Sequence, residues 1–171
     1  MSGPVGIEVS AGIVEAGWID CNGHMNVAYY VLAFDRAVDD FWSRLGITSE
    51  YIETTRGSTF AVENHITWQR ELNLDEPYQV TTQIIAYDEK RIHQFQRMYH
   101  QEKKYLAATA EWMNLHVDLE SRRVTKWPAS VLDKLRHYSA LQKGLAAPVE
   151  AGRQMRIASP LYAMDRGAAG G

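Results

Sequence analysis

The sequence contains a single cysteine, Cys21, among its 171 residues. One cysteine excludes an internal disulfide framework and any metal site built from several cysteines. The longest apolar runs are short, as at residues 31–34, whereas a membrane-spanning helix needs about 20 apolar residues. The first ten residues lack the basic and apolar regions of a signal peptide. These absences predict a cytoplasmic protein without a membrane partner.

A strong charge of either sign is also missing. The chain has 18 Lys and Arg against 21 Asp and Glu, for a net charge of −3 at pH 7. Since no basic run appears, nucleic acid is not expected as a partner. No Gly-x-Ser-x-Gly string is present, which argues against a serine α/β-hydrolase. The length and the hydrophobic fraction of 46% fit one domain with a sizeable core.

The periodicity of the apolar residues predicts an α+β domain. A spacing of three and four predicts a long helix over 26–45, ended by Gly46, and a second helix over 129–141. Strands are expected at 7–17, 59–72, 78–87, 91–100 and 105–118, joined by loops and short polar turns. In the strand 59–72, alternation places Phe60, Val62, Asn64, Ile66 and Trp68 on one face, and Ala61, Glu63, His65, Thr67 and Gln69 on the other.

A curved antiparallel sheet wrapped around the first helix is the simplest way to bury its wide apolar stripe. The domain is expected to cover residues 1–143. Residues 144–171 are rich in Gly and Ala and lack periodicity, so we expect a partly disordered tail ending in RGAAGG.

The stretch GWIDCNGHMNVAYY, residues 17–30, leads into the long helix. Asp20, Asn22 and Asn26 are good capping residues, and Gly23 permits a left-handed turn, so the stretch is explained by helix capping alone. A helix N-terminus also offers unpaired N–H groups that stabilise an oxyanion. Beside them Asp20 is able to attack a carbonyl carbon or to deprotonate water. Ester or thioester hydrolysis is the chemistry that such a pair serves best.

The string DCNGHMN, residues 20–26, followed by Tyr29 and Tyr30, resembles the motif of hotdog-fold thioesterases. Asp20 and Gly23 match the 4-hydroxybenzoyl-CoA thioesterase-like group. Asp20, Asn22 and His24 match, in order and spacing, the proposed catalytic set of acyl-ACP thioesterases. The later string ITWQRELNLDEPYQVTTQI resembles the second strand, turn and third strand of the family, and Glu71 falls where acyl-ACP thioesterases carry a further catalytic carboxylate.

The resemblance implies a single hotdog fold that forms a homodimer or a dimer of dimers, with active sites between subunits and no metal or cofactor. Acyl-ACP thioesterases are double-hotdog chains, and this chain has room for one hotdog, so CoA is the expected carrier. The implied function is an acyl-CoA thioesterase acting on a short, medium, aromatic or betainyl-like acyl group. The alternative is a non-catalytic hotdog module that binds acyl-CoA or serves in assembly.

Each site residue has a proposed role and a structural alternative. Asp20 is the expected nucleophile or general base. Asn22 either orients a water molecule or Asp20, or is only a turn residue. Gly23 would let the thioester oxygen approach the N–H of His24 or Met25. The His24 ring either donates to the carbonyl, or relays a proton to the leaving thiolate, or only packs at the dimer seam. Asn26 either contributes to substrate binding or only caps the helix.

Other reactive side chains are given weaker roles. Cys21 is a rival nucleophile, but a lone cysteine is more often a small packing residue. Glu63 and His65 either meet the site across a dimer or form a solvated face. Several basic residues are candidates for the CoA phosphates, although surface solvation is the simpler role for most of them: Arg70, Lys90, Arg91 and Arg97. His93, His100 and His116 lack the spacing of metal ligands.

Overall fold

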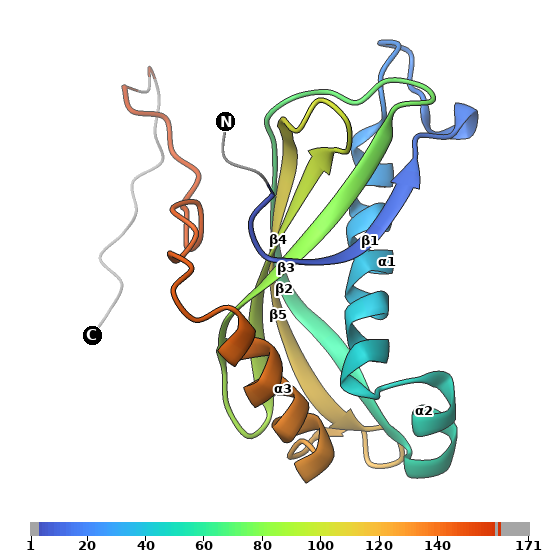
Figure 1. Cartoon of the computed structure of the whole chain (residues 1–171), viewed down its shortest axis with the longest axis vertical. Coiled ribbons are helices and arrows are strands. Elements are labelled where there is room, and N and C mark those ends of the chain that lie inside the picture. The colour runs from blue at the N-terminus through green and yellow to red at the C-terminus, as the bar shows by residue number, and fades with distance from the viewer. Residues whose placement is uncertain (1–3, 160, 162–171) are drawn as a thin grey trace.

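The computed structural model describes residues 4–159 and 161 and shows one curled antiparallel sheet with a long helix against one face (Figure 1). The elements in chain order are β1 (Ile7–Ile13), a 3-10 turn (Ala16–Trp18), α1 (Val27–Leu45), α2 (Ser49–Thr55), β2 (Gly57–Trp68), β3 (Pro77–Tyr87), β4 (Arg91–His100), β5 (Leu106–Asp118), β6 (Arg123–Val124) and α3 (Ala129–Leu141). The strand order is β1-β3-β4-β5-β2, and β6 pairs with β5. The predicted α+β hotdog architecture is confirmed.

The helix α1 occupies the predicted position for the predicted reasons. The Asn26 Oδ1 accepts a hydrogen bond from the Ala28 N–H at 2.9 Å, and Gly46 ends the helix with a left-handed φ of 89°. The apolar stripe between these two residues is buried against the sheet. Asn26 is therefore the helix cap, and its side-chain oxygen is occupied by the hydrogen bond from Ala28.

The predicted faces of β2 are wrong over its first half. The pairing with β5 shifts between Ala61 and Glu63, so Val62 is an extra residue in a β-bulge. Because a one-residue insertion reverses the alternation, Phe60 lies on the opposite face from Ile66 and Trp68. The strand also ends at Trp68 rather than residue 72, just as β1 ends at Ile13 rather than 17.

The helix α2 lies in a segment that we expected to be a loop. Its first turn is capped by Thr48, whose hydroxyl oxygen accepts from the Tyr51 N–H at 3.2 Å. Tyr51 then packs toward β5, where its hydroxyl lies 2.9 Å from the Nε2 of buried His116. The short helix therefore closes one end of the core.

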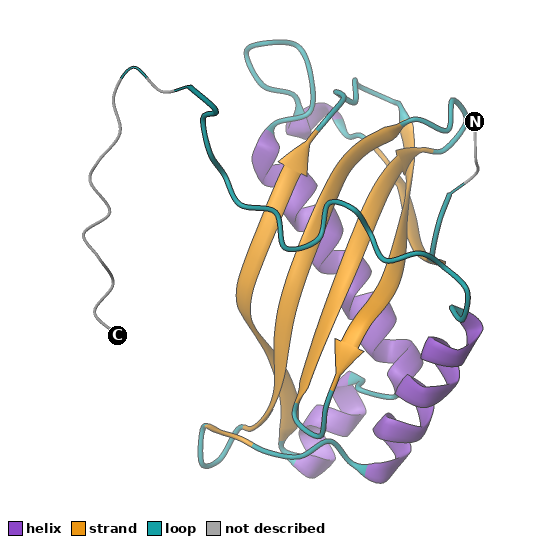
Figure 2. Cartoon of the chain, turned by 90° about the vertical axis from the view of Figure 1, so that its left-hand side faces the viewer, coloured by secondary structure: helices purple, strands orange, loops and turns teal. Residues whose placement is uncertain are grey.

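The segment 142–154, which we call the strap, crosses the face of the sheet that points away from α1 (Figure 2). Gln142 bonds to β3 where its pairing with β1 ends, donating to the Thr82 carbonyl at 3.2 Å and accepting from the Ile84 N–H at 2.8 Å. Further along, Glu150 lies 3.6 Å from Arg97 on β4, and the Gly152 N–H donates to Glu111 on β5 at 2.8 Å. The first part of the predicted tail is thus attached to the sheet, whereas the RGAAGG string lies outside the described residues.

Within the described part of the chain, no helix combines the length and the apolar character needed to cross a membrane.

Candidate active site

A closed turn precedes α1 and carries the predicted motif. Ile19 and Met25 form an isolated antiparallel bridge. Inside it the Asp20 N–H donates to the His24 carbonyl at 3.0 Å, and the Gly23 N–H donates to the Asp20 carbonyl at 3.0 Å. Gly23 has a φ of +85°, and a Cβ at this position would meet open space, so conformation rather than crowding requires the glycine.

The turn brings the Asp20 carboxylate near the His24 ring. The Oδ1 of Asp20 accepts from the Asn22 N–H at 2.8 Å and lies 3.9 Å from the Nδ1 of His24. The two side chains are 16% and 32% exposed, respectively, so both remain accessible to a substrate. Asn22 and Cys21 are exposed, and the Asn22 main chain orients the carboxylate. Asp20 is therefore both a turn residue and a carboxylate with a second oxygen available.

The backbone donors around the turn are mostly occupied. The Met25 N–H donates to the Leu72 carbonyl at 2.8 Å, and the Asn26 N–H donates to the Trp18 carbonyl at 2.8 Å. Of the two predicted oxyanion donors, Met25 is therefore ruled out by its role in the fold. The His24 N–H has no hydrogen-bond partner among the described residues, which makes it the candidate donor.

A pocket of about 230 Å³ opens beside this turn, between the start of α1 and the end of β2. It is lined by His24, Met25, Val27, Tyr30, Trp68, Gln69, Arg70 and Glu71. The fold thus brings three predicted site residues together: His24, Met25 and Glu71. The other predicted residues of the turn do not line the pocket: Asp20, Asn22, Gly23 and Asn26. Asp20 is connected to the pocket by its 3.9 Å approach to His24. Tyr30 was predicted as an apolar helix residue at the end of the motif, and Trp68 was predicted only as a residue on one face of a strand.

Hydrogen bonds hold residues 69–76, the segment whose first three residues line the pocket and which we call the pocket wall. The Leu72 N–H donates to the hydroxyl of buried Tyr30 at 2.9 Å, and burial raises the pKa of that hydroxyl. The Tyr105 hydroxyl donates to the Glu71 carbonyl at 3.0 Å, and the Arg70 guanidinium lies 3.9 Å from the centre of the Tyr105 ring. Together with the Met25–Leu72 bond, these contacts fix the wall against both α1 and β5.

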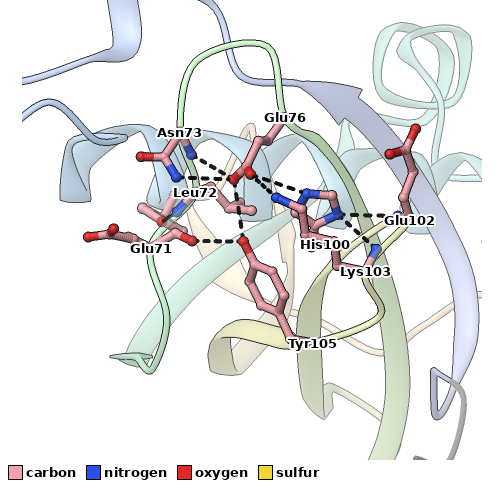
Figure 3. Close-up of polar contacts among 9 residues, drawn as sticks. Glu71, Leu72, Asn73, Glu76, His100, Glu102, Lys103 and Tyr105 are labelled. Atoms are coloured by element: carbon pink, nitrogen blue, oxygen red, sulfur yellow. Dashed lines mark hydrogen bonds and ion pairs between the residues drawn. The ribbon is translucent and has the colours of Figure 1, made fainter.

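Glu76 anchors the far end of the same wall (Figure 3). Its carboxylate accepts hydrogen bonds from Lys103 and from the Asn73 N–H, and it lies 3.5 Å from the Nε2 of His100. The Nδ1 of His100 accepts two backbone N–H groups, from Glu102 and Lys103, so the ring proton is on Nε2 and faces Glu76. Glu76 therefore joins the wall to the turn between β4 and β5.

Glu76 should make stability depend on pH in acid. Burial alone would raise the pKa of Glu76, but the hydrogen bonds from Lys103 and Asn73 and the positive charge of Lys103 lower it to about 2. A lowered pKa in the folded state means that the contribution is complete above pH about 4.5 and is lost as the pH falls toward 2. We expect Glu76→Gln to cost about 1 kcal/mol of unfolding free energy at pH 7, and the difference from wild type to shrink below pH 4.5.

Urea unfolding at several pH values measures this difference. Glu102→Gln is the matched control, because the Glu102 carboxylate points away from the cluster (Figure 3). A Glu76→Gln deficit that stays constant down to pH 2.5 would contradict the assignment.

Two of the basic residues considered for the CoA phosphates are paired with groups of the protein itself. Arg97 is buried beneath the strap, where it donates to Gln83 at 3.2 Å and faces Glu150, so it is not available for a CoA phosphate. Arg91 pairs with Asp88 in the turn before β4.

Glu63 and His65 lie on the outer face of the sheet, in a hollow separate from the pocket beside α1. In the same hollow His93 bonds Glu111 at 2.7 Å, and Gly152 of the strap borders it.

Known proteins resemble this chain in both sequence and structure. Residues 14–135 match the sequence model of the thioesterase-like superfamily. A Rhizobium meliloti (strain 1021) protein named L-carnitine dehydrogenase/betainyl-CoA thioesterase is 36% identical over 142 residues, which are 83% of this chain and 28% of that protein. The betainyl-CoA thioesterase of Pseudomonas aeruginosa is 29% identical over 136 residues, covering 80% of this chain and 86% of the relative. The chain thus spans less than a third of the first relative and most of the second.

A solved structure shows the same architecture. A Staphylococcus aureus protein determined in complex with CoA superposes with a TM-score of 0.84 and 28% identity. The alignment covers 92% of this chain and 99% of that one.

Proposed function

Because the chain belongs to the thioesterase-like superfamily, we propose that it hydrolyses an acyl-CoA thioester to a carboxylic acid and CoA. The observation that carries the proposal is the Asp20 carboxylate, 3.9 Å from His24, which itself lines a pocket beside the start of α1. The names of the relatives and the CoA bound to the Staphylococcus aureus protein support the same chemistry.

The proposed reaction uses the turn as a unit. With the acyl group in the pocket, the His24 N–H donates to the thioester oxygen and stabilises the charge that develops there. Asp20 removes a proton from water, and the resulting hydroxide adds to the thioester carbon; alternatively, the carboxylate attacks that carbon directly. The C–S bond then breaks, and the His24 ring supplies a proton to the leaving thiolate. Water attack gives the carboxylic acid at this step, whereas direct attack gives an anhydride of Asp20 that a water molecule then hydrolyses to the acid and the free carboxylate.

A homodimer would complete this site. The outer edge of β2 has no strand beside it among the described residues, and residues 61–64 on it are exposed. An unpaired edge strand is a template for pairing with another chain. Since Trp68 at the end of β2 lines the pocket, a second copy paired along β2 would lie next to the bound acyl group. The proposal assigns no cofactor and no metal to the reaction, and the cytoplasmic location remains a prediction from the sequence.

A panel of acyl-CoA esters, incubated with the protein and a thiol reagent, tests the proposed function. We expect release of free CoA thiol at a rate proportional to enzyme concentration, together with a dimer or dimer of dimers in solution. Binding of acyl-CoA without thiol release would favour the alternative, a non-catalytic hotdog module.

A further inference from the structure

The pocket wall presents an unpaired carboxylate beside an aromatic ring. Glu71 and Trp68 both line the pocket, and the Trp68 side chain is 47% exposed. Among the described residues the Glu71 carboxylate forms no hydrogen bond or ion pair. It also points away from the Glu76 cluster, whereas the Glu71 carbonyl is held by Tyr105 (Figure 3). The backbone is therefore fixed while the charge is left for a ligand.

We propose that Trp68 and Glu71 select acyl groups that carry a quaternary ammonium, an inference that rests on the proposed thioesterase function. The face of an indole ring attracts a cation because of its quadrupole, and aromatic residues recognise quaternary ammonium ligands in this way. A carboxylate adds charge complementarity that a neutral acyl group cannot use. A trimethylammonium has no N–H group, so it requires no hydrogen-bond acceptor from the wall.

Arg70 is the one cationic side chain that could cancel Glu71, and its guanidinium is held elsewhere. It stacks on the Tyr105 ring at 3.9 Å, and no ion pair joins it to Glu71. The remaining ionisable groups in the lining are Tyr30, whose hydroxyl pKa is raised by burial, and His24, which is next to the reacting carbon in the proposed mechanism. The cation of the substrate would therefore meet one opposing charge at the wall.

The dimensions of the pocket agree with a small acyl group. A volume of about 230 Å³ accommodates a trimethylammonium one methylene away from the thioester carbon. Two relatives carry betainyl-CoA thioesterase in their names, and the betainyl group has this structure.

A second hollow has similar chemistry but already contains a cation. It lies between β1 and α1 and includes Trp18, Tyr78 and Asp39. There the Arg36 guanidinium sits 5.7 Å from the centre of the Trp18 ring, in the place that a ligand cation would take. This hollow shows the fold pairing a cation with an indole, whereas the indole of Trp68 has no cation–π contact with a side chain among the described residues.

The test compares two substrates of the same shape. Betainyl-CoA and 3,3-dimethylbutyryl-CoA differ in one atom, because a neutral carbon replaces the positively charged nitrogen. We expect wild-type kcat/KM to favour betainyl-CoA by at least about tenfold, and Glu71→Gln or Trp68→Leu each to lower that ratio by about tenfold. Glu53→Gln, on the exposed face of α2, is the charge-matched control and should leave the ratio unchanged.

The results distinguish a failure of cation selection from a failure of the proposed thioesterase function. Hydrolysis of neither substrate, nor of any other acyl-CoA, would overturn the proposed function. Equal hydrolysis of both substrates by wild type would overturn only the selection of a cation. An equal loss on both substrates in Glu71→Gln, with the ratio preserved, would instead assign Glu71 to catalysis, as the resemblance to acyl-ACP thioesterases implies.

Discussion

Asp20→Asn is expected to lower kcat for thioester hydrolysis by about 10²–10⁴-fold while the protein remains folded. Asparagine keeps an oxygen that accepts the Asn22 N–H, so the turn before α1 is retained. It has no carboxylate to remove a proton or attack the thioester carbon. Steady-state thiol release measures the loss, and the unchanged unfolding midpoint in urea shows that the fold is intact.

Cys21→Ser is the matched control for Asp20→Asn. Cys21 is exposed in the same turn, next to Asp20, and should retain nearly all activity when changed to serine. Loss of turnover in Cys21→Ser with Asp20→Asn still active would make the thiol the nucleophile. A single turnover in ¹⁸O-labelled water tests for direct attack by Asp20. If the carboxylate forms an anhydride and water attacks its aspartyl carbon, the first ¹⁸O atom enters Asp20 and the acid carries an unlabelled oxygen from Asp20.

The long helix and its site turn could be predicted because local chemistry specifies them. Asn26 and Gly46 mark the two ends of a helix by their own side-chain and backbone properties, and the structure uses both in this way. The motif at residues 20–26 places Asp20 near His24 by its spacing alone, since a tight turn cannot separate residues four positions apart. These are interactions within a few residues, which the sequence encodes directly.

The pocket wall could not be predicted in this way, because its members come from different elements. Trp68 ends a strand, whereas Tyr105, which holds Glu71 in place, lies 34 residues beyond Glu71 along the chain. The bulge at Val62 has no signal either: valine fits a regular strand equally well, and only the pairing with β5 exposes the extra residue. Alternation alone therefore assigned Phe60 to the wrong face.

The strap was missed for a related reason. It has no periodicity because it forms no helix or strand, and it is held by single contacts such as those of Gln142 and Glu150 with distant strands. Such contacts form only when the strands that they join are already paired in the sheet. The two faces of the sheet should consequently differ in stability, since α1 covers one and the irregular strap covers part of the other.

Phe41→Ala is expected to lower the free energy of unfolding by about 3–5 kcal/mol, the largest stability effect that we expect for a single side chain here. Phe41 is fully buried on α1 and contacts Trp42 and the edge of Tyr138, with ring centres 6.1 and 5.8 Å away. Since rigid elements surround this ring on every side, they cannot collapse into the space that it leaves. Equilibrium urea unfolding gives the value.

Phe95→Ala makes the same chemical change on the other face of the sheet. Phe95 is 2% exposed, but it lies on the face crossed by the strap, and the Arg97 guanidinium is 4.9 Å from its ring centre. A long side chain and an irregular segment can settle into the vacated space, so the loss should be at least about 1 kcal/mol smaller than for Phe41→Ala. Equal losses would mean that the strap packs as rigidly as α1 and that the sheet has two cores. A smaller loss, accompanied by faster proteolysis within residues 142–154, would show instead that the outer face is held by a cover that detaches before the sheet unfolds.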